Sequence, residues 1–525
     1  MLGTMRVSDP DILFINPNQL RPPVAPLALE YLGTFLRKKG YRTLLWDFCR
    51  NPRLLSDLKE NLVKVRPGLI GITFRNLDDA YLFSGRGFVP ELKNLVKEIK
   101  KSSGAPVVIG GTGFSLAPRE ILRITGADFG IWGEGEAALP ELLEVVRLLG
   151  CSVVGKRSEV AGLLGGQVVS RENIPATQQP NHLATLFSGI PGLVWREGKE
   201  IRQNPPGYIE DLDYLALENR GFIDNHFYFN RGGMGGFESK RGCDRSCIYC
   251  ADPVAKGRRM RLRSPESVAE EVQRLLTLGV TYFHTCDSEF NHPREHARAI
   301  CREFIRRGLG RKIRWYAYCT PAGFDREFAR VMKAAGCRGI NFGTDHTEDS
   351  MLRKLGRDYG FTEIERARNS CRGEGIVVML DLLLGGPGET RKTLTGVIEK
   401  IKKLDPERVG LSLGVRVYPG TELARKVASE GKLPKNPNLQ GELENNGNLL
   451  KPVFFLSEEL GKKPLNYLQK LVDDDRRFFI PSGKEAEKDY KYDDNDYISR
   501  AISREGYRGA FWEILRRKAE GIKPD

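Results

Sequence analysis

No stretch of about 20 consecutive apolar residues occurs in this 525-residue sequence, so it lacks a segment that could cross a membrane as a helix. The longest apolar stretches are interrupted by Asp381 or by glycine. The N-terminus has Asp9 and Pro10 before its first apolar stretch, which is unlike a signal peptide. We therefore expect a cytoplasmic protein.

Histidine and cysteine are both scarce. None of the six histidines lies in residues 1–150, and the ten cysteines are scattered except for one group of three. Scattered cysteines in a chain of this length do not indicate a disulfide framework, whereas a local group favours metal binding in a reducing compartment.

Charge is unbalanced, with 82 Lys and Arg against 68 Asp and Glu, a formal net charge of +14. Residues 240–263 contain eight basic side chains and only Asp244 and Asp252 as acids. Such a segment is typical of a nucleic-acid site or of a basic surface around anionic cofactors. No recognisable RNA- or DNA-binding motif accompanies it, so a nucleic-acid partner is disfavoured.

Short β-rich runs alternate with amphipathic stretches in the first 150 residues. The runs are 11–17, 41–48, 69–76, 106–113 and 129–136, and the apolar residues 29, 32, 35 and 36 between the first two have helical spacing. This alternation predicts an α/β fold with a doubly wound, Rossmann-like parallel sheet in residues 1–150. Its ligand should lie beyond the carboxyl ends of the strands.

A second alternating region follows a connector at residues 151–230. Strands are expected at 236–241, 281–286, 312–318, 338–343, 376–383 and 409–416, with helices between them. Six such units predict a partial (β/α)6 barrel over residues 231–425, with its chemistry at the C-terminal strand ends. Residues 426–525 are expected to cap the barrel mouth and shape the substrate pocket.

The three grouped cysteines are Cys243, Cys247 and Cys250, on one loop just after the first expected barrel strand. Cysteine thiolates are the usual ligands of [4Fe-4S] clusters, and three of them leave one iron open to a small molecule. A structural zinc site needs four protein ligands, and no second pair follows at zinc-finger spacing. The spacing therefore predicts a [4Fe-4S] cluster. Cys286, Cys301, Cys319, Cys337 and Cys371 lack cluster spacing, and we expect them to be small buried core residues.

This loop resembles the CxxxCxΦC loop of the radical S-adenosylmethionine (SAM) superfamily, with Tyr249 as the aromatic residue. Residues 384–390 resemble the GGPGET segment of that superfamily, and residues 286–291 resemble a DxxFN variant found in cobalamin-dependent members. The resemblance implies that the open iron binds SAM. The implied SAM-binding residues are Tyr249, Asp287, Ser288, Glu289, Gly385, Gly386, Pro387 and Gly388. Glu289 has an alternative role as a helix cap.

The N-terminal region is similar to the B12-binding domain of class B radical SAM enzymes, on the basis of its glycine-rich strand ends. The implied cobalamin-binding residues are Thr73, Arg75, Asn76, Gly110, Gly111, Thr112, Gly133, Glu134, Gly135 and Glu136. With no histidine in residues 1–150, the cobalt has no histidine ligand from this domain. Arg75 would face the cobalt from below as a poor metal ligand, or would pair with Asp78 or Asp79.

The resemblance implies an enzyme, a methyltransferase that moves a methyl group from SAM through cobalamin to an unactivated carbon. Alternatives are a cobalamin-dependent cyclase or rearrangement enzyme, a non-radical methylase of the tryptophan C2 type, and an Fe–S or corrinoid sensor that binds nucleic acid. Arg75, Tyr316 and Tyr318 are the candidate catalytic residues, although aromatic residues on a strand also pack in cores. The substrate would be a small molecule, lipid or peptide, and an external flavodoxin- or ferredoxin-type protein would donate electrons.

Overall fold

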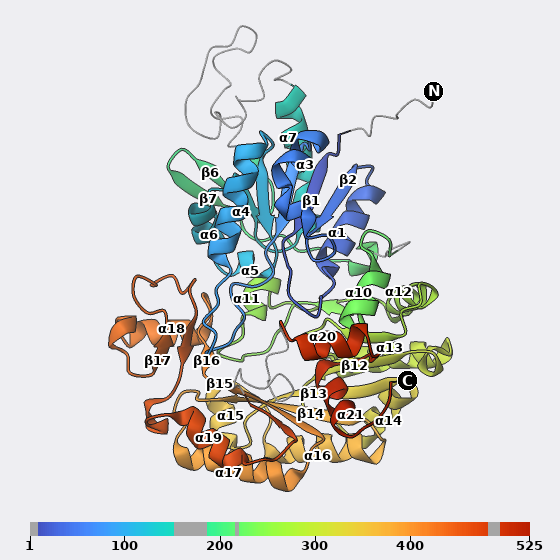
Figure 1. Cartoon of the computed structure of the whole chain (residues 1–525), viewed down its shortest axis with the longest axis vertical. Helices are drawn as coiled ribbons and strands as arrows, with labels where there is room; N and C mark the ends of the chain where they lie inside the picture. Colours follow the sequence, from blue (N-terminus) through green and yellow to red (C-terminus); the bar gives the residue numbers. More distant parts are fainter. Residues whose placement is uncertain (1–8, 152–185, 216–219, 481–493, 525) are drawn as a thin grey trace.

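The computed structural model describes residues 9–151, 186–215, 220–480 and 494–524. Two seven-stranded sheets dominate it, one in an N-terminal domain and one in a curved half-barrel below that domain (Figure 1). Both fold-class predictions, the doubly wound sheet and the partial barrel, are confirmed. No helix within the described ranges is long and apolar enough to cross a bilayer.

The N-terminal sheet contains the five expected strands, all mutually parallel. They are β1 (Ile12–Asn16), β2 (Thr43–Asp47), β3 (Leu69–Thr73), β4 (Val107–Gly110) and β5 (Phe129–Ile131). Their spatial order is β2-β1-β3-β4-β5, so the strand order reverses between β1 and β3. In such sheets the ligand lies at this reversal, beyond the carboxyl ends.

Two further strands extend this sheet from within the expected connector. β6 (Leu193–Glu197) pairs antiparallel with β5, and β7 (Glu200–Gln203) pairs antiparallel with β6. The helices of this domain are α1 (Leu27–Lys38), α2 (Arg53–Ser56), α3 (Leu58–Val65), α4 (Val89–Ser102), α5 (Thr112–Ser115), α6 (Pro118–Thr125) and α7 (Gly135–Cys151). The described part of residues 151–230 therefore contributes to the N-terminal sheet and also contains α10 (Asn225–Gly232).

The barrel sheet contains all six expected strands in parallel register. They are β8 (Gly235–Phe237), β11 (Tyr282–Thr285), β12 (Arg314–Cys319), β13 (Cys337–Asp345), β14 (Val377–Leu384) and β15 (Arg408–Leu413). A seventh short strand, β19 (Phe478–Phe479), comes from the C-terminal region and pairs with β15. The strands are largely buried, as expected for a parallel sheet covered on both faces.

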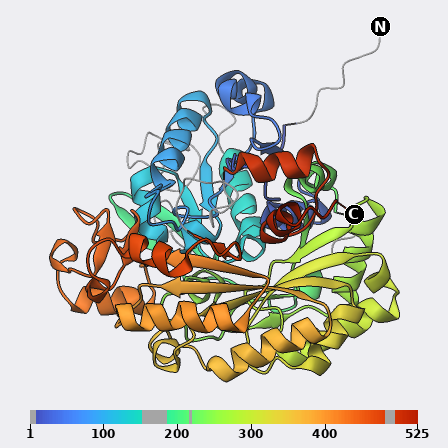
Figure 2. The same ribbon diagram turned by 60° about the horizontal axis from the view of Figure 1, so that its bottom comes forward.

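Helices cover the outer face of this sheet, and the other face looks toward the N-terminal domain (Figure 2). They are α12 (Pro265–Thr277), α13 (Arg294–Arg306), α14 (Arg326–Ala334), α15 (Asp349–Lys354), α16 (Phe361–Gly373) and α17 (Arg391–Leu404). Local sequence explains where α12 begins, because the Ser264 side chain accepts a hydrogen bond from the Ser267 amide and proline occupies the first helical position.

The C-terminal region contributes a three-stranded sheet and several helices. Its elements are β16 (Val415–Arg416), α18 (Glu422–Ser429), β17 (Leu439–Gly441), β18 (Val453–Phe455), α19 (Pro464–Val472), α20 (Asp496–Ser503) and α21 (Phe511–Ala519). Helices α20 and α21 lie at the junction between the N-terminal domain and the half-barrel (Figure 1). The end of the chain thus reaches the space between the two sheets.

Candidate active site

A cavity of about 1470 Å³ lies between the two domains. The N-terminal domain lines it with its strand ends and the segments that follow them, and the half-barrel with residues 232–241 and 252–256, the ends of β11 and β12 and the middle of β13. The helices α20 and α21 complete the wall. Pockets for drug-sized ligands usually measure about 300–1,000 Å³. This cavity is large enough for a bulky cofactor together with a second molecule.

All ten residues expected to bind cobalamin line this cavity: Thr73, Arg75, Asn76, Gly110, Gly111, Thr112, Gly133, Glu134, Gly135 and Glu136. A Cβ at Gly110 would meet only one atom within 4 Å, the Ile131 carbonyl oxygen at 3.9 Å, so space is open beside this glycine. Gly111 has a φ of +106°, and a Cβ there would lie 2.7 Å from the Phe74 carbonyl oxygen. Glycine is therefore required where the loop after β4 crosses the loop after β3. The open space at this edge fits a large planar cofactor.

Arg75 is exposed at the cavity wall, and the structure gives Asp78 a different partner. The Asp78 carboxylate is buried and lies 2.7 Å from the Arg416 guanidinium of β16. Within the described part of the chain, Arg75 forms no ion pair. Its guanidinium is therefore available to a ligand in the cavity. The alternative, a pair of Arg75 with Asp78 or Asp79, is not observed among the described residues.

The structure separates the two candidate tyrosines. Tyr318 is 40% exposed and lines the cavity, with its ring 5.1 Å from the His284 ring. Tyr316 is buried, and its ring packs against Trp512 at a centroid distance of 6.0 Å. Tyr316 is thus a core residue beneath the cavity, because α21 covers it, and only Tyr318 can touch a bound molecule.

Cys286 corrects the expectation that the ungrouped cysteines are core residues. Cys301, Cys319, Cys337 and Cys371 are buried as expected, but Cys286 is exposed and lines the cavity. It directly follows β11, where the strand opens toward the space between the domains.

The cluster loop runs from β9 (Lys240–Arg241) to α11 (Asp252–Lys256), and its three cysteines are free thiols. The Cys250 amide donates to the Cys247 carbonyl at 3.2 Å, which turns the loop back on itself. Burial raises the pKa of the Cys247 thiol to about 11 and also raises that of Cys243. No three His, Cys, Asp or Glu side chains in the described ranges converge as a preformed metal site. The donor set of three thiols nevertheless fits an iron–sulfur cluster, whose binding would displace the thiol protons.

The implied SAM-binding residues fall into two groups. Tyr249 and Glu289 meet through Arg357, which donates to the Tyr249 hydroxyl at 2.8 Å and to the Glu289 carboxylate at 3.0 Å. Glu289 also accepts from Arg245 at 3.0 Å. These contacts tie Glu289 to the cluster loop. Glu289 does not cap the next helix, α13, whose N-cap residue is Pro293.

Asp287 belongs to the other group. Its buried carboxylate accepts hydrogen bonds from the Ser239 amide (2.9 Å) and hydroxyl (2.6 Å), and the Ser288 hydroxyl donates to Asp252. These groups therefore hold the backbone next to the cluster loop in place. The turn Gly385, Gly386, Pro387 and Gly388 follows β14, where the Gly385 amide donates to Glu389 at 2.6 Å.

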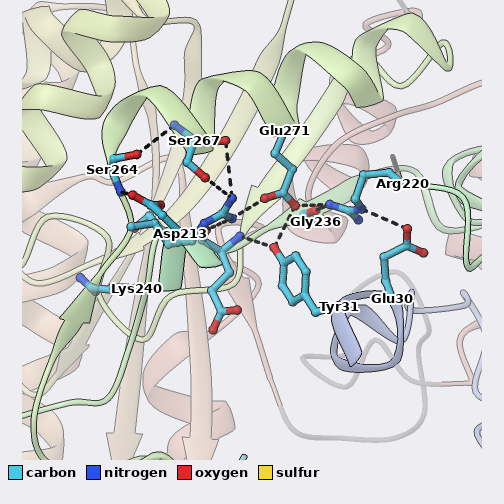
Figure 3. Close-up of polar contacts among 12 residues, drawn as sticks. Glu30, Tyr31, Asp213, Arg220, Gly236, Lys240, Ser264, Ser267 and Glu271 are labelled. Atoms are coloured by element: carbon cyan, nitrogen blue, oxygen red, sulfur yellow. Dashed lines mark hydrogen bonds and ion pairs between the residues drawn. The ribbon is translucent and has the colours of Figure 1, made fainter. Parts of the chain in front are cut away.

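A buried ionic network that sequence analysis did not anticipate joins the two domains (Figure 3). The Tyr31 hydroxyl of α1 donates to Glu271 of α12 at 2.8 Å, and both Arg220 and Arg263 donate to the same carboxylate. Arg220 also lies 3.5 Å from Glu30. Burial raises the pKa of Glu271, but the two guanidinium groups lower it by more than burial raises it. The pKa of Glu271 is therefore lowered overall. Two carboxylates thus balance two guanidinium groups at the interface.

A second ionic group lies at the cavity wall. Arg241 approaches Glu136 at 3.0 Å and Glu238 at 3.1 Å, and Arg261 approaches Glu134 at 2.7 Å. Lys240, Arg261 and Arg263 are buried, and Arg241 is nearly so. Half of the basic residues in 240–263 therefore serve the interior and the domain interface rather than a nucleic-acid surface.

Two family models match separate parts of the chain. The B12 binding domain matches residues 18–143, and the Radical SAM superfamily matches residues 237–401. Tryptophan 2-C-methyltransferase of Streptomyces laurentii is 30% identical, over 96% of this chain and 96% of its own. The chain belongs to the family of cobalamin-dependent radical SAM methyltransferases. The predicted cofactors, cobalamin, SAM and a [4Fe-4S] cluster, are thereby confirmed at the level of the family.

Solved structures agree with this assignment to the cobalamin-dependent radical SAM methyltransferases. The methyltransferase TsrM from Kitasatospora setae, with tryptophan and aza-SAM bound, superimposes with a TM-score of 0.82 at 30% identity, covering 97% of this chain and 98% of its own. The same enzyme with cobalamin and a [4Fe-4S] cluster gives 0.81 at 28% identity and the same coverage. OxsB, at a TM-score of 0.64 and 15% identity over 88% of this chain and 65% of its own, shares the fold.

Proposed function

We propose that this enzyme transfers a methyl group from SAM to carbon 2 of tryptophan or of a closely related indole. The observation that carries the proposal is the similarity over 97% of the chain to an enzyme solved with tryptophan bound. The barrel side of the cavity supports it, because Tyr318 and His284 offer aromatic surfaces to a flat ring.

Each cofactor has a set of residues that fits it. Cys243, Cys247 and Cys250 would hold the cluster, and the glycine-rich edge of the N-terminal sheet would hold cobalamin. When bound, cobalamin supplies a metal that relays a methyl group, and the cluster supplies an iron that binds SAM. The chain's own contribution is to hold the two domains against each other through the networks at Glu271 and Arg241. An external flavodoxin- or ferredoxin-type protein would supply electrons.

The structure of the methylated product tests which substrate the enzyme uses. Anaerobically reconstituted enzyme, incubated with SAM and tryptophan, should yield tryptophan heavier by one methylene unit, with the carbon 2 proton signal lost from its NMR spectrum. 2-Methyltryptophan, in which this carbon is blocked, is the matched control and should not react. Methylation of the control, or of a non-indole metabolite in preference to tryptophan, would contradict the proposal.

The cobalt environment gives a spectroscopic prediction. Since residues 1–150 contain no histidine, the Co(II) form of the bound cofactor should show no superhyperfine splitting from a protein imidazole in its electron paramagnetic resonance spectrum. Among the described histidines, His284 lines the cavity, and burial lowers its pKa. Splitting that persists in a His284→Gln variant would contradict placement of cobalamin in the N-terminal domain.

A further inference from the structure

The side chain of Asn341 projects from the middle of β13 into the half-barrel. Gly339, Asn341 and Gly343 alternate along this strand and therefore share one face of the sheet. A Cβ at Gly339 would lie 2.9 Å from Trp512 and 2.9 Å from Tyr316, and a Cβ at Gly343 would lie 3.3 Å from Arg357. The two glycines make room for these large neighbours and leave Asn341 as the side chain between them.

Asn341 is buried, 3% exposed, and contributes to the cavity wall. Its neighbours in strand register are Tyr318 on β12 and Met379 on β14. Among the described residues, no donor lies within hydrogen-bonding reach of its side-chain oxygen. An unpaired buried acceptor lowers the equilibrium constant for folding by a factor of about 5 to 150. Such a group in a cavity wall calls for a ligand that completes it.

The surroundings favour the acceptor substrate over SAM as that ligand. Of the residues expected to bind SAM, Asp287 and Ser288 contribute to this cavity wall, but Tyr249, Glu289 and the turn at 385–388 do not. All ten residues expected to bind cobalamin contribute to it, as do Tyr318 and Trp512. A neutral amide beside Met379 suits an uncharged donor, such as the N–H of an aromatic heterocycle.

We propose that Asn341 is a substrate-recognition residue whose side-chain carbonyl accepts a hydrogen bond from a ring N–H of the substrate. For an indole this donor is the ring nitrogen, adjacent to carbon 2, so the bond fixes which ring carbon faces the methyl donor. The inference rests on the proposed function, since it concerns the same cavity and the same class of substrate.

The thermal stability of two variants of the substrate-free protein tests whether the Asn341 side-chain oxygen lacks a partner. Asn341→Leu removes an acceptor that has no partner, so the Tm of the substrate-free protein should stay the same or rise. The matched control is Asn291→Leu. Asn291 is also buried, but its amide donates to the Thr320 carbonyl at 2.8 Å and accepts from the Thr320 amide at 2.9 Å. This control should lower the Tm by roughly 2 °C or more. An equal loss in both variants would overturn the inference, whatever the substrate.

A substrate comparison tests the hydrogen bond itself. The wild type should have a KM for tryptophan about 10- to 100-fold lower than that for 3-benzothienylalanine, in which sulfur replaces the N–H. Asn341→Leu should remove this difference and leave the dissociation constant of SAM unchanged. A wild type that methylates tryptophan and its analogue equally, or a variant that loses SAM affinity instead, would overturn the inference. Failure of the wild type to methylate tryptophan would count against the proposed function, and the stability comparison would then decide on Asn341.

Discussion

Replacing Cys243, Cys247 or Cys250 by Ala is expected to reduce the iron of the reconstituted protein from about four atoms per chain to near zero, because each thiolate holds one iron of a single cluster. The loop offers no replacement ligand of the same kind, since the remaining cysteines of the barrel lie in its core or at the cavity wall. Iron and sulfide analysis with the visible absorption spectrum measures the loss.

Cysteines outside the loop provide the matched controls for this prediction. Cys319→Ala and Cys371→Ala remove thiols that are fully buried in the barrel core. Both variants should retain the full iron content once folded. A triple variant of the loop that still carries a [4Fe-4S] cluster would show that the cluster lies elsewhere.

Glu271→Gln is expected to lower the free energy of unfolding by about 3–5 kcal/mol, the usual cost of removing one member of a buried ion pair. Arg220 and Arg263 would remain buried with Glu30 as the remaining carboxylate of the network. The substitution weakens the contact between α1 and α12, so protease sensitivity between the domains should rise as well. Urea unfolding followed by fluorescence measures the first effect.

The preceding residue of the same helix gives a close control for Glu271. Glu270 is half exposed and pairs only loosely with Arg274, at 3.7 Å, and with Arg307, at 3.6 Å. Glu270→Gln should change the free energy of unfolding by about 0.5 kcal/mol or less. Equal effects of the two variants would mean that the buried network does not hold the domains together.

The strands could be predicted because their signal is local. Each of the eleven expected strands is a short apolar run bounded by a helix or a turn, and each occurs in the structure. β6 and β7 lie in the segment expected to be a connector with short strands, but their pairing with the N-terminal sheet was not expected, and neither was β19. β19 has only two residues, and it becomes a strand through pairing with β15, which lies about 70 residues earlier. β6 and β7 do carry a hairpin signal at Gly198, whose φ is +61°.

The site was predictable only where its residues are neighbours in sequence. The cysteine loop and the glycine-rich strand ends are local motifs, and the structure places the latter around one cavity. The separation of Tyr316 from Tyr318 was not predictable, because it depends on Trp512, almost 200 residues later. The sequence contains one indication of the interface network. Glu271 lies on the apolar face of α12, with Val268, Val272 and Leu275. A charged residue at such a position indicates a buried partner.

The most direct test of the central claim is a single turnover with methyl-labelled SAM and tryptophan, with and without cobalamin during reconstitution. We expect labelled methyltryptophan and an equal amount of S-adenosylhomocysteine when cobalamin is present, and neither product without it. Because carbon 2 of an indole is electron-rich, stoichiometric 5′-deoxyadenosine should not accompany them. Deoxyadenosine formed without labelled tryptophan would contradict the proposed methyl transfer and would indicate a cyclase or rearrangement enzyme instead.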